Sequence, residues 1–299
     1  MVISMSAAAG ESFGGRLRRW SGEWRRMAAL PLAGSTPERV GRLYDIVGTR
    51  NLFGEESLFI NLGYWRDDPA TLDEASADLA RLVGREAGLG AEDVLVDVGF
   101  GYGDQDFLWA REFGPRRIVG VNVAEEQIAI ARERAAELGL AEVIEYVHGS
   151  ASALPVGDGS ATKVTALESA FHFPSYTQFF GEAHRVLAPG GRLVTADIVP
   201  RVLPGAAGLS WSGRDVFDAQ RYRKALLEAG FETAHVYSIR RDVYGPLARY
   251  LRSRLREQDM RRVNPVLRLA FSRTGVRLWG PWADYIIAVA VKGGERPLI

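Results

Sequence analysis

The chain has 299 residues, of which 47% are apolar and 25% charged, an ordinary composition for a soluble globular protein with a substantial core. Its 37 basic and 37 acidic side chains cancel, so no overall field draws it towards nucleic acid. The absence of cysteine excludes disulfides, thiolate metal sites and cysteine nucleophiles, and no metal site is expected. No secretory signal and no run of about 18 apolar residues occurs, so we expect a cytoplasmic protein without stable membrane insertion.

Residues 1–70 are expected to form an N-terminal arm and a helical cap, ahead of a main domain over residues 71–299. Within the arm, Trp20 and Trp24 are four residues apart, so they would share one helix face. Two interpretations stay open: a partly disordered arm with one surface helix, or an arm that folds over a site or over a neighbouring subunit. The second interpretation allows a homo-oligomer that forms through the arm.

The main domain is expected to alternate helices and strands. Thr71 and Glu74 form a capping box for a first helix that ends near Gly88. We expect strands at 94–98, 117–121, 143–147, 163–167, 192–198, 231–239 and 284–291, and helices at 104–113, 124–138, 175–187 and 215–229. This alternation predicts βαβ units and an α/β fold with a parallel sheet. The mainly helical segment 243–278 is expected as an insertion, or lid, before the last strand.

The first predicted strand ends in a loop with three glycines at alternate positions. The strand contains the carboxylate of Asp97, and Gly99, Gly101 and Gly103 follow it. Glycine lets such a loop turn tightly and bring its backbone N–H groups against a ligand. A dinucleotide-binding fingerprint needs a third glycine where this chain has Asp104, so an NAD-dependent oxidoreductase is disfavoured.

Four later segments add further motifs, namely Gly120–Val123, His148–Pro155, Ala166–Phe173 and Arg185–Leu193. Together with the glycine loop they resemble, in the same order, the motifs of the class I S-adenosylmethionine (SAM)-dependent methyltransferases. The resemblance covers roughly residues 58–199 and resumes at 226–239 and 284–292. It implies a Rossmann-like fold with a seven-stranded, mostly parallel sheet, an N-terminal helical cap and a helical insertion before the last strand.

The same resemblance implies SAM as the cofactor and a set of residues that bind it. Asp97 would lie near its ammonium group, and Asn122 and Gln127 near the ribose. The family usually has acids at positions 122 and 150, where this chain has Asn and Ser. For Gln127 and Tyr64 a solvated helix position and a packing position are the competing interpretations. The implied cofactor-binding residues are Tyr64, Asp97, Gly99, Gly101, Gly103, Asn122, Val123, Gln127, Ser150, Ala151 and Leu167.

Methyl transfer requires an aligned nucleophile, exclusion of water and a group that takes one proton. Glu168 and His172 lie four residues apart in the segment that faces the transferred methyl group in the family, so both are candidates for a general base. Glu168 is alternatively the carboxylate that stabilises a carbocation in alkene C-methyltransferases, and Tyr44 in the cap is a further catalytic candidate. His172, between two phenylalanines, is alternatively a packing residue.

The acceptor is expected to be a lipophilic small molecule, because aromatic residues are frequent in the cap and after the fourth strand. Amino-methyltransferases of nucleic acids carry an Asp-Pro-Pro-Tyr type signature where this chain has Leu167–Ala170, so nucleic acid is not expected as a partner. The leading hypothesis is a SAM-dependent methyltransferase acting on a polyketide, alkaloid, quinone or terpenoid in secondary metabolism, including antibiotic biosynthesis. One alternative is a SAM-binding fold recruited for cyclisation or for non-catalytic binding.

A second alternative is an isoprenoid diphosphate C-methyltransferase. The segment 240–277 contains eleven arginines and three acids, and such a segment could bind an anionic diphosphate. The competing interpretation of the same arginines is a solvated helix face.

Overall fold

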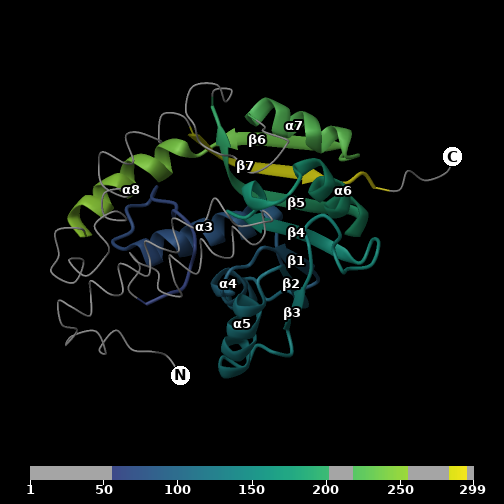
Figure 1. Ribbon diagram of the computed structural model, residues 1–299, viewed down its shortest axis with the longest axis horizontal. Helices are drawn as coiled ribbons and strands as arrows, with labels where there is room; N and C mark the ends of the chain where they lie inside the picture. Colours follow the sequence, from purple (N-terminus) through teal and green to yellow (C-terminus); the bar gives the residue numbers. More distant parts are fainter. Residues whose placement is uncertain (1–55, 202–217, 255–282, 295–299) are drawn as a thin grey trace, which may run out of the picture.

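The computed structural model describes residues 56–201, 218–254 and 283–294. The elements are α3 (Leu72–Ala87), β1 (Val94–Val98), α4 (Asp104–Glu112), β2 (Arg117–Asn122), α5 (Glu125–Glu137), β3 (Ile144–His148), β4 (Ala161–Leu167), the short 3-10 helix η3 (Ala170–His172), α6 (Tyr176–Val186), β5 (Leu187–Pro200), α7 (Ala219–Glu228), β6 (Thr233–Ser238), α8 (Arg240–Arg254) and β7 (Ala283–Val291). Figure 1 shows their arrangement.

The strands form one seven-stranded sheet in the order β3-β2-β1-β4-β5-β7-β6. The pairs from β3 through β5 are parallel, whereas β7 runs antiparallel to both of its neighbours, β5 and β6. The predicted seven-stranded, mostly parallel sheet is therefore confirmed. The central strands β1 and β2 are buried on both faces because helices cover both faces of the sheet, as in doubly wound α/β proteins.

Two hydrophobic clusters lie on opposite faces of the sheet. One cluster packs α3, α4, α5 and the start of α8 against residues such as Leu95, Ile118 and Tyr285. The other packs α6 and α7 against residues such as Val96 and Ile286. Figure 1 shows α6 and α7 on one side of the sheet and α3, α4 and α5 on the other. The protein is thus a three-layer α/β/α structure.

The capping signals of α3 explain where this helix begins and ends. The backbone N–H of Glu74 donates to Thr71 Oγ1 (3.2 Å), as predicted. The Glu74 carboxylate accepts instead from the backbone of Ala70 (2.7 Å), one residue before the position that a capping box uses. Gly88 has φ of +61° and ends the helix in the left-handed conformation that glycine favours.

The cap and the insertion are only partly described. Of the predicted helical cap, residues 56–70 are seen, and they contain no helix. This segment packs against α8, because the Trp65 N–H donates to Asp242 O (2.8 Å) and the Trp65 ring lies 5.1 Å from that of Tyr250. The helix α8 lies between β6 and β7 in the chain, as predicted for the insertion, but it begins at Arg240. Residues 255–278 of the predicted insertion are outside the described part. The domain boundary at residue 70 stays a prediction.

Two strand predictions need correction. The strand β5 begins at Leu187 rather than at Arg192, because residues before Arg192 are still paired: Leu187 pairs with β4, and the Gly190 N–H donates to Lys292 O (3.0 Å). The strand β4 begins at Ala161 rather than Lys163, since Ala161 pairs with Leu187. Within the described ranges, no helix has the length and apolar character needed to span a bilayer.

Candidate active site

A cavity opens at the carboxyl ends of β1, β2 and β4. The strand β1 has β2 on one side and β4 on the other, so the chain order reverses at this point of the sheet. Open α/β sheets bind ligands at such a switch point. Of the predicted site residues, the cavity wall contains Gly99, Gly101, Asn122, Val123, Gln127, Ser150, Ala151, Glu168 and His172.

The glycine loop has the backbone that its sequence predicts. Gly99, Gly101 and Gly103 have φ of +82°, +60° and +89°, all in the left-handed region. A Cβ at Gly99 would overlap the side chain of Ser169 in the loop after β4. Gly103 is not on the cavity wall; a Cβ there would overlap the Tyr146 hydroxyl, so this glycine allows α4 to pack on the sheet. The loop therefore divides into two cavity glycines and one packing glycine.

Asp97 lies behind the cavity wall rather than on it. Its side chain is fully buried and accepts hydrogen bonds from Thr165 Oγ1 (2.7 Å) and Gln105 Nε2 (3.0 Å). Gln105, which the sequence motifs do not single out, is on the wall. Burial raises the pKa of Asp97 to about 6, and burial together with the charge of Asp97 raises the pKa of the neighbouring Asp106 well above its usual value. Asp97 therefore lies next to the cavity through Gln105, and its predicted role near the ammonium group of SAM stays a prediction.

Asn122 and Gln127 form a hydrogen-bonded pair at the end of β2. Asn122 Nδ2 donates to Gln127 Oε1 (2.8 Å), and Asn122 Oδ1 accepts from the backbone of Ala124 (3.1 Å). Both side chains are buried and both are on the cavity wall. The neighbouring Val123 is 41% exposed although it is a large apolar residue, and it also lines the cavity. This corner therefore offers amide groups beside an uncovered apolar surface.

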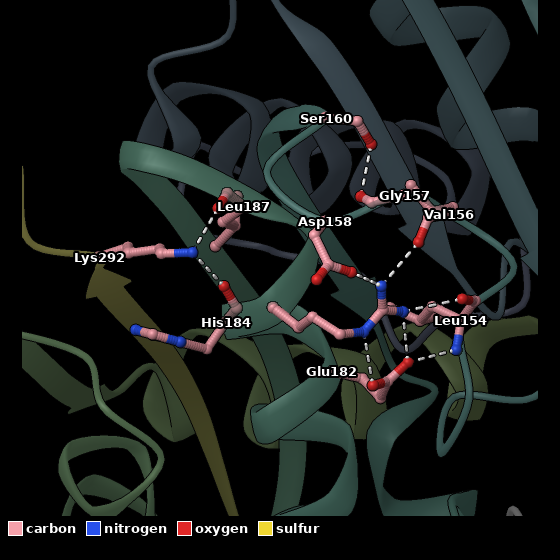
Figure 2. Close-up of polar contacts among 10 residues, drawn as sticks. Leu154, Val156, Gly157, Asp158, Ser160, Glu182, His184, Leu187 and Lys292 are labelled. Atoms are coloured by element: carbon pink, nitrogen blue, oxygen red, sulfur yellow. Dashed lines mark hydrogen bonds and ion pairs between the residues drawn. The ribbon is translucent and has the colours of Figure 1, made fainter.

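The wall next to the end of β2 comes from the loop after β3, which Arg185 of α6 holds in place. The guanidinium of Arg185 donates to the backbone carbonyls of Leu154 and Val156 and to the carboxylates of Asp158 and Glu182. These four acceptors are labelled in Figure 2. The backbone N–H of Leu154 also donates to Glu182 (2.7 Å). This arrangement anchors the loop that begins with the wall residues Ser150 and Ala151.

Glu168 follows β4 and is held from three directions. Its backbone N–H donates to Ala196 O on β5 (2.7 Å), and its φ of +49° is left-handed, which is uncommon for a residue with a Cβ. Its Oε1 accepts from the backbone of Leu62 (2.6 Å) and from the hydroxyl of Tyr285 on β7 (2.6 Å). Burial raises its pKa to about 7 although these two hydrogen bonds lower it. Strained backbone of this kind is common at functional sites.

His172 lies in η3, and its ring centre is 4.0 Å from that of Phe171, with the two planes tilted by 44°. It is on the cavity wall, near the same end as Glu168, Ser169 and Phe173. Burial lowers its pKa to about 4, so the ring is neutral at pH 7. The two catalytic candidates therefore share one cavity, as the sequence predicted, but their protonation equilibria lie on opposite sides of pH 5.

Besides Asp97 and Gly103, two further predicted site residues are buried away from the cavity wall. Tyr64 is buried in the core beside α3, because the left-handed turn at Gly63 directs the chain towards Ala75. Leu167 is buried in the same core cluster. Tyr44 is outside the described residues. Ile60, four residues before Tyr64, is the residue of this segment that lines the cavity wall instead.

Comparisons with known proteins agree with this geometry. Residues 96–195 match the family model described as a methyltransferase domain. The erythromycin 3''-O-methyltransferase of Saccharopolyspora erythraea is 36% identical over 272 residues, which cover 84% of this chain and 89% of that protein. The 27-O-demethylrifamycin SV methyltransferase of Amycolatopsis mediterranei is 33% identical, covering 66% of this chain and 75% of that protein.

The crystal structure of the cyclase SpnF superposes with a TM-score of 0.70 at 25% identity, covering 88% of this chain and 98% of that one. The sheet order, the glycine loop at its switch point and a relative at 36% identity over most of both chains all agree. The chain belongs to the class I SAM-dependent methyltransferases.

Proposed function

We propose that the protein transfers the methyl group of SAM to a hydroxyl oxygen of a polyketide natural product, with Glu168 as the general base. The observation that carries the proposal is the Glu168 carboxylate, which stands on the cavity wall with a pKa near 7. A base whose pKa lies near the operating pH is effective in proton transfer. The two relatives are named as methyltransferases of erythromycin and of a demethylrifamycin, each at an oxygen, which supports the choice of acceptor.

The walls of the cavity fit SAM. Gly99 and Gly101 leave room for close backbone approach, with Gln105 beside them for the methionine end. The Asn122–Gln127 pair suits the ribose hydroxyls, since amides both donate and accept. Val123 and Ala151 provide apolar surface for the adenine, and the Ser150 hydroxyl provides a polar edge. SAM would supply an electrophilic methyl group on a sulfonium sulfur.

In the proposed reaction the acceptor oxygen forms a bond to the methyl carbon while the carbon–sulfur bond breaks and its electron pair stays on sulfur. The hydroxyl proton goes to the Glu168 carboxylate. Phe173, Pro174 and Ile60 line the wall near Glu168 and exclude water, which strengthens the interactions of the buried carboxylate. His172, neutral at pH 7, orients the acceptor through its ring nitrogens. Aromatic and aliphatic walls of this kind suit a lipophilic acceptor.

The alternatives are less well supported. A protein that only catalysed cyclisation would not need the methyl group of SAM. The relatives that match at 33% and 36% identity are named as methyltransferases, which favours methyl transfer. For a diphosphate acceptor, α8 places Arg249 and Arg252 on its surface, but neither is on the cavity wall. The arginines at 255–277 are outside the described residues.

A panel of acceptors tests the proposal. The protein is incubated with SAM carrying a labelled methyl group and with a macrolide or rifamycin that has a free hydroxyl, its O-methylated counterpart, or geranyl diphosphate. We expect S-adenosylhomocysteine and a labelled methyl ether with the free hydroxyl only. Label on a carbon atom, or transfer to geranyl diphosphate alone, would overturn the choice of acceptor.

A further inference from the structure

Tyr285 is a fully buried residue of β7 that no cofactor motif contains. Its hydroxyl donates to Glu168 Oε1 at 2.6 Å, across 117 residues of sequence. Tyr285 itself is not on the cavity wall. It therefore touches the reaction only through Glu168.

The strand register explains how the ring reaches Glu168. Tyr285 pairs with Ile198 on β5, and two residues earlier on β5 the carbonyl of Ala196 accepts the backbone N–H of Glu168. Ala196 and Tyr285 belong to the same core cluster and thus to the same sheet face. Because Ala196 carries only a methyl group, the ring of Tyr285 has space to cross β5 towards the end of β4. Tyr285 on β7 therefore supports Glu168, which follows β4, across the intervening strand β5.

Two donors of different origin share one oxygen of Glu168. Tyr285 provides a hydroxyl from the sheet, and Leu62 provides a backbone N–H from the segment that precedes α3. The other oxygen, Oε2, accepts no hydrogen bond from the described part of the chain. One oxygen is thus anchored, whereas the other is left for an acceptor in the cavity.

We propose that Tyr285 is a positioning residue that, with the Leu62 N–H, fixes Oε1 of Glu168 so that Oε2 takes the proton of the acceptor hydroxyl. The proposal rests on the proposed function, in which Glu168 is the base. Tyr285 has two effects in it. It holds the rotamer of the carboxylate, and it stabilises the ionised form by donating a charge-assisted hydrogen bond.

The groups around Glu168 set the direction of the expected change. Asp197 on β5 raises the pKa of Glu168 by its charge, and Tyr285 and the Leu62 N–H lower it. Tyr244 of α8 also lies close, with its ring 6.2 Å from that of Tyr285, and His172 of η3 shares the cavity. Only Tyr285 and Leu62 donate to the carboxylate within the described residues. Removing the Tyr285 hydroxyl therefore raises the pKa of Glu168.

The first experiment compares kcat as a function of pH in the wild type and in Tyr285→Phe, with an acceptor that the wild type methylates. We expect the acidic limb of the profile to move up by about one pH unit, since a hydrogen bond to a charged group contributes about that much, and turnover at pH 7 to fall about fivefold as the ionised fraction of Glu168 drops. The KM for SAM is expected to stay the same. A wild-type profile in Tyr285→Phe would overturn the proposal.

A matched control is Tyr237→Phe. Tyr237 donates to Glu86 Oε1 at 2.7 Å, so this variant also deletes one tyrosine–glutamate hydrogen bond, but outside the cavity wall. The acidic limb and the turnover of Tyr237→Phe should equal those of the wild type. An equal shift in both variants would mean that a general loss of stability, rather than Glu168, causes the effect, and would overturn the proposal.

Glu168→Gln and the double variant with Tyr285→Phe separate the proposal from the function on which it rests. If Glu168 is the base, Glu168→Gln removes the acidic limb of the pH profile. Adding Tyr285→Phe to Glu168→Gln then lowers turnover little further. Wild-type turnover in Glu168→Gln would refute the base, and with it the proposed function. A slow Glu168→Gln together with an unchanged Tyr285→Phe would refute only the positioning role.

A variant that keeps the ring and changes only the acidity of the hydroxyl provides a test that does not depend on the stability of Tyr285→Phe. A fluorotyrosine incorporated at position 285 is a stronger hydrogen-bond donor than tyrosine. We expect the acidic limb to move down in pH, opposite to the shift in Tyr285→Phe. A limb that stays in place would contradict the proposal.

Discussion

Glu168 combines a left-handed backbone, a buried side chain on the cavity wall and two hydrogen bonds to one carboxylate oxygen. The positive φ and the burial each cost free energy of folding, because a residue with a Cβ disfavours positive φ and a buried carboxylate loses hydration, whereas the two hydrogen bonds offset part of that cost. Such costs are common where a side chain must be held for chemistry. At the residue scale, the protonation of this one side chain therefore decides whether it can accept the proton of the acceptor.

The pH dependence of turnover distinguishes the two candidate bases. A general base must be deprotonated, and burial raises the pKa of Glu168 to about 7 but lowers that of His172 to about 4. We expect kcat to rise between pH 6 and pH 8 with a midpoint near 7, measured with saturating substrates. In His172→Ala the midpoint should stay near 7. A profile that is flat above pH 5 would point to His172 as the base.

The glycine loop predicts a contrast between two alanine substitutions. Gly99 and Gly114 both have positive φ, but a Cβ at Gly99 would overlap Ser169, whereas none of the described heavy atoms lies within 4 Å of a Cβ at Gly114. We expect Gly114→Ala to cost about 1 kcal/mol of stability and to leave SAM affinity unchanged. Gly99→Ala should weaken SAM binding at least about 100-fold, as measured by titration calorimetry. Equal SAM affinity in the two variants would contradict the assigned role of Gly99.

At the scale of elements, α6 supports the cavity from outside it. Arg185 binds two carbonyls and two carboxylates, and through them fixes the loop between β3 and β4 (Figure 2). A side chain remote from the ligand can in this way decide the shape of a binding wall. The Arg-Val-Leu segment that resembles the family motif has a structural role of this kind.

We expect Arg185→Met to raise the Kd for SAM about tenfold, since losing about 1.4 kcal/mol of loop ordering corresponds to that factor. The acidic limb of kcat should not move, because Arg185 does not contact Glu168. Arg117→Met is the matched control: Arg117 forms an exposed ion pair with Glu145 between β2 and β3, away from the cavity wall. Fluorescence titration of SAM measures both values, and a Kd that rises equally in the two variants would refute the anchoring role.

Elements were more predictable from the sequence than their contacts. The strand at 94–98 and the helix from residue 104 were located correctly because buried apolar runs and glycine turns are local signals. The partners of Glu168 are 106 and 117 residues away, so no local pattern could identify Leu62 or Tyr285. Gln105 could not be predicted as a wall residue, because a glutamine in the first turn of a helix is usually solvated.

The same limit explains the predicted residues that lie outside the cavity. Aromatic residues near a site can face either the ligand or the core, and Tyr64 faces the core because Gly63 reverses the chain before it. Asp97 is central to the loop motif, yet it acts on Gln105 rather than on the wall directly. In each case the residue type was informative, whereas its direction depended on tertiary packing.

At the scale of the whole molecule, several buried carboxyls make stability depend on pH. Burial raises the pKa of Asp97 to about 6 and of Glu168 and Asp197 to about 7, above their values in the unfolded chain. Between pH 4 and pH 7 the folded protein therefore holds protons that the unfolded chain has released. Stability from such groups is present at low pH and is lost as pH rises through their folded-state pKa values.

Urea unfolding at pH 5, 6 and 7 tests this expectation. The contribution of each such carboxyl to the free energy of unfolding should fall by up to about 1.4 kcal/mol per pH unit over this range. Asp197→Asn keeps the oxygen that accepts from Ile198 and removes the titration, so its stability should decline less steeply with pH. An equal slope in Asp197→Asn and the wild type would show that Asp197 is already ionised at pH 5.

The central claim is that the protein methylates a hydroxyl oxygen with Glu168 as the base. Its most direct test is single-turnover formation of S-adenosylhomocysteine by the wild type and by Glu168→Gln, with SAM and a hydroxyl-bearing polyketide both saturating. The account predicts a methyl ether from the wild type and a rate at least about 100-fold lower in Glu168→Gln, with SAM affinity retained. Equal rates in the two proteins, or a product methylated at carbon, would contradict it.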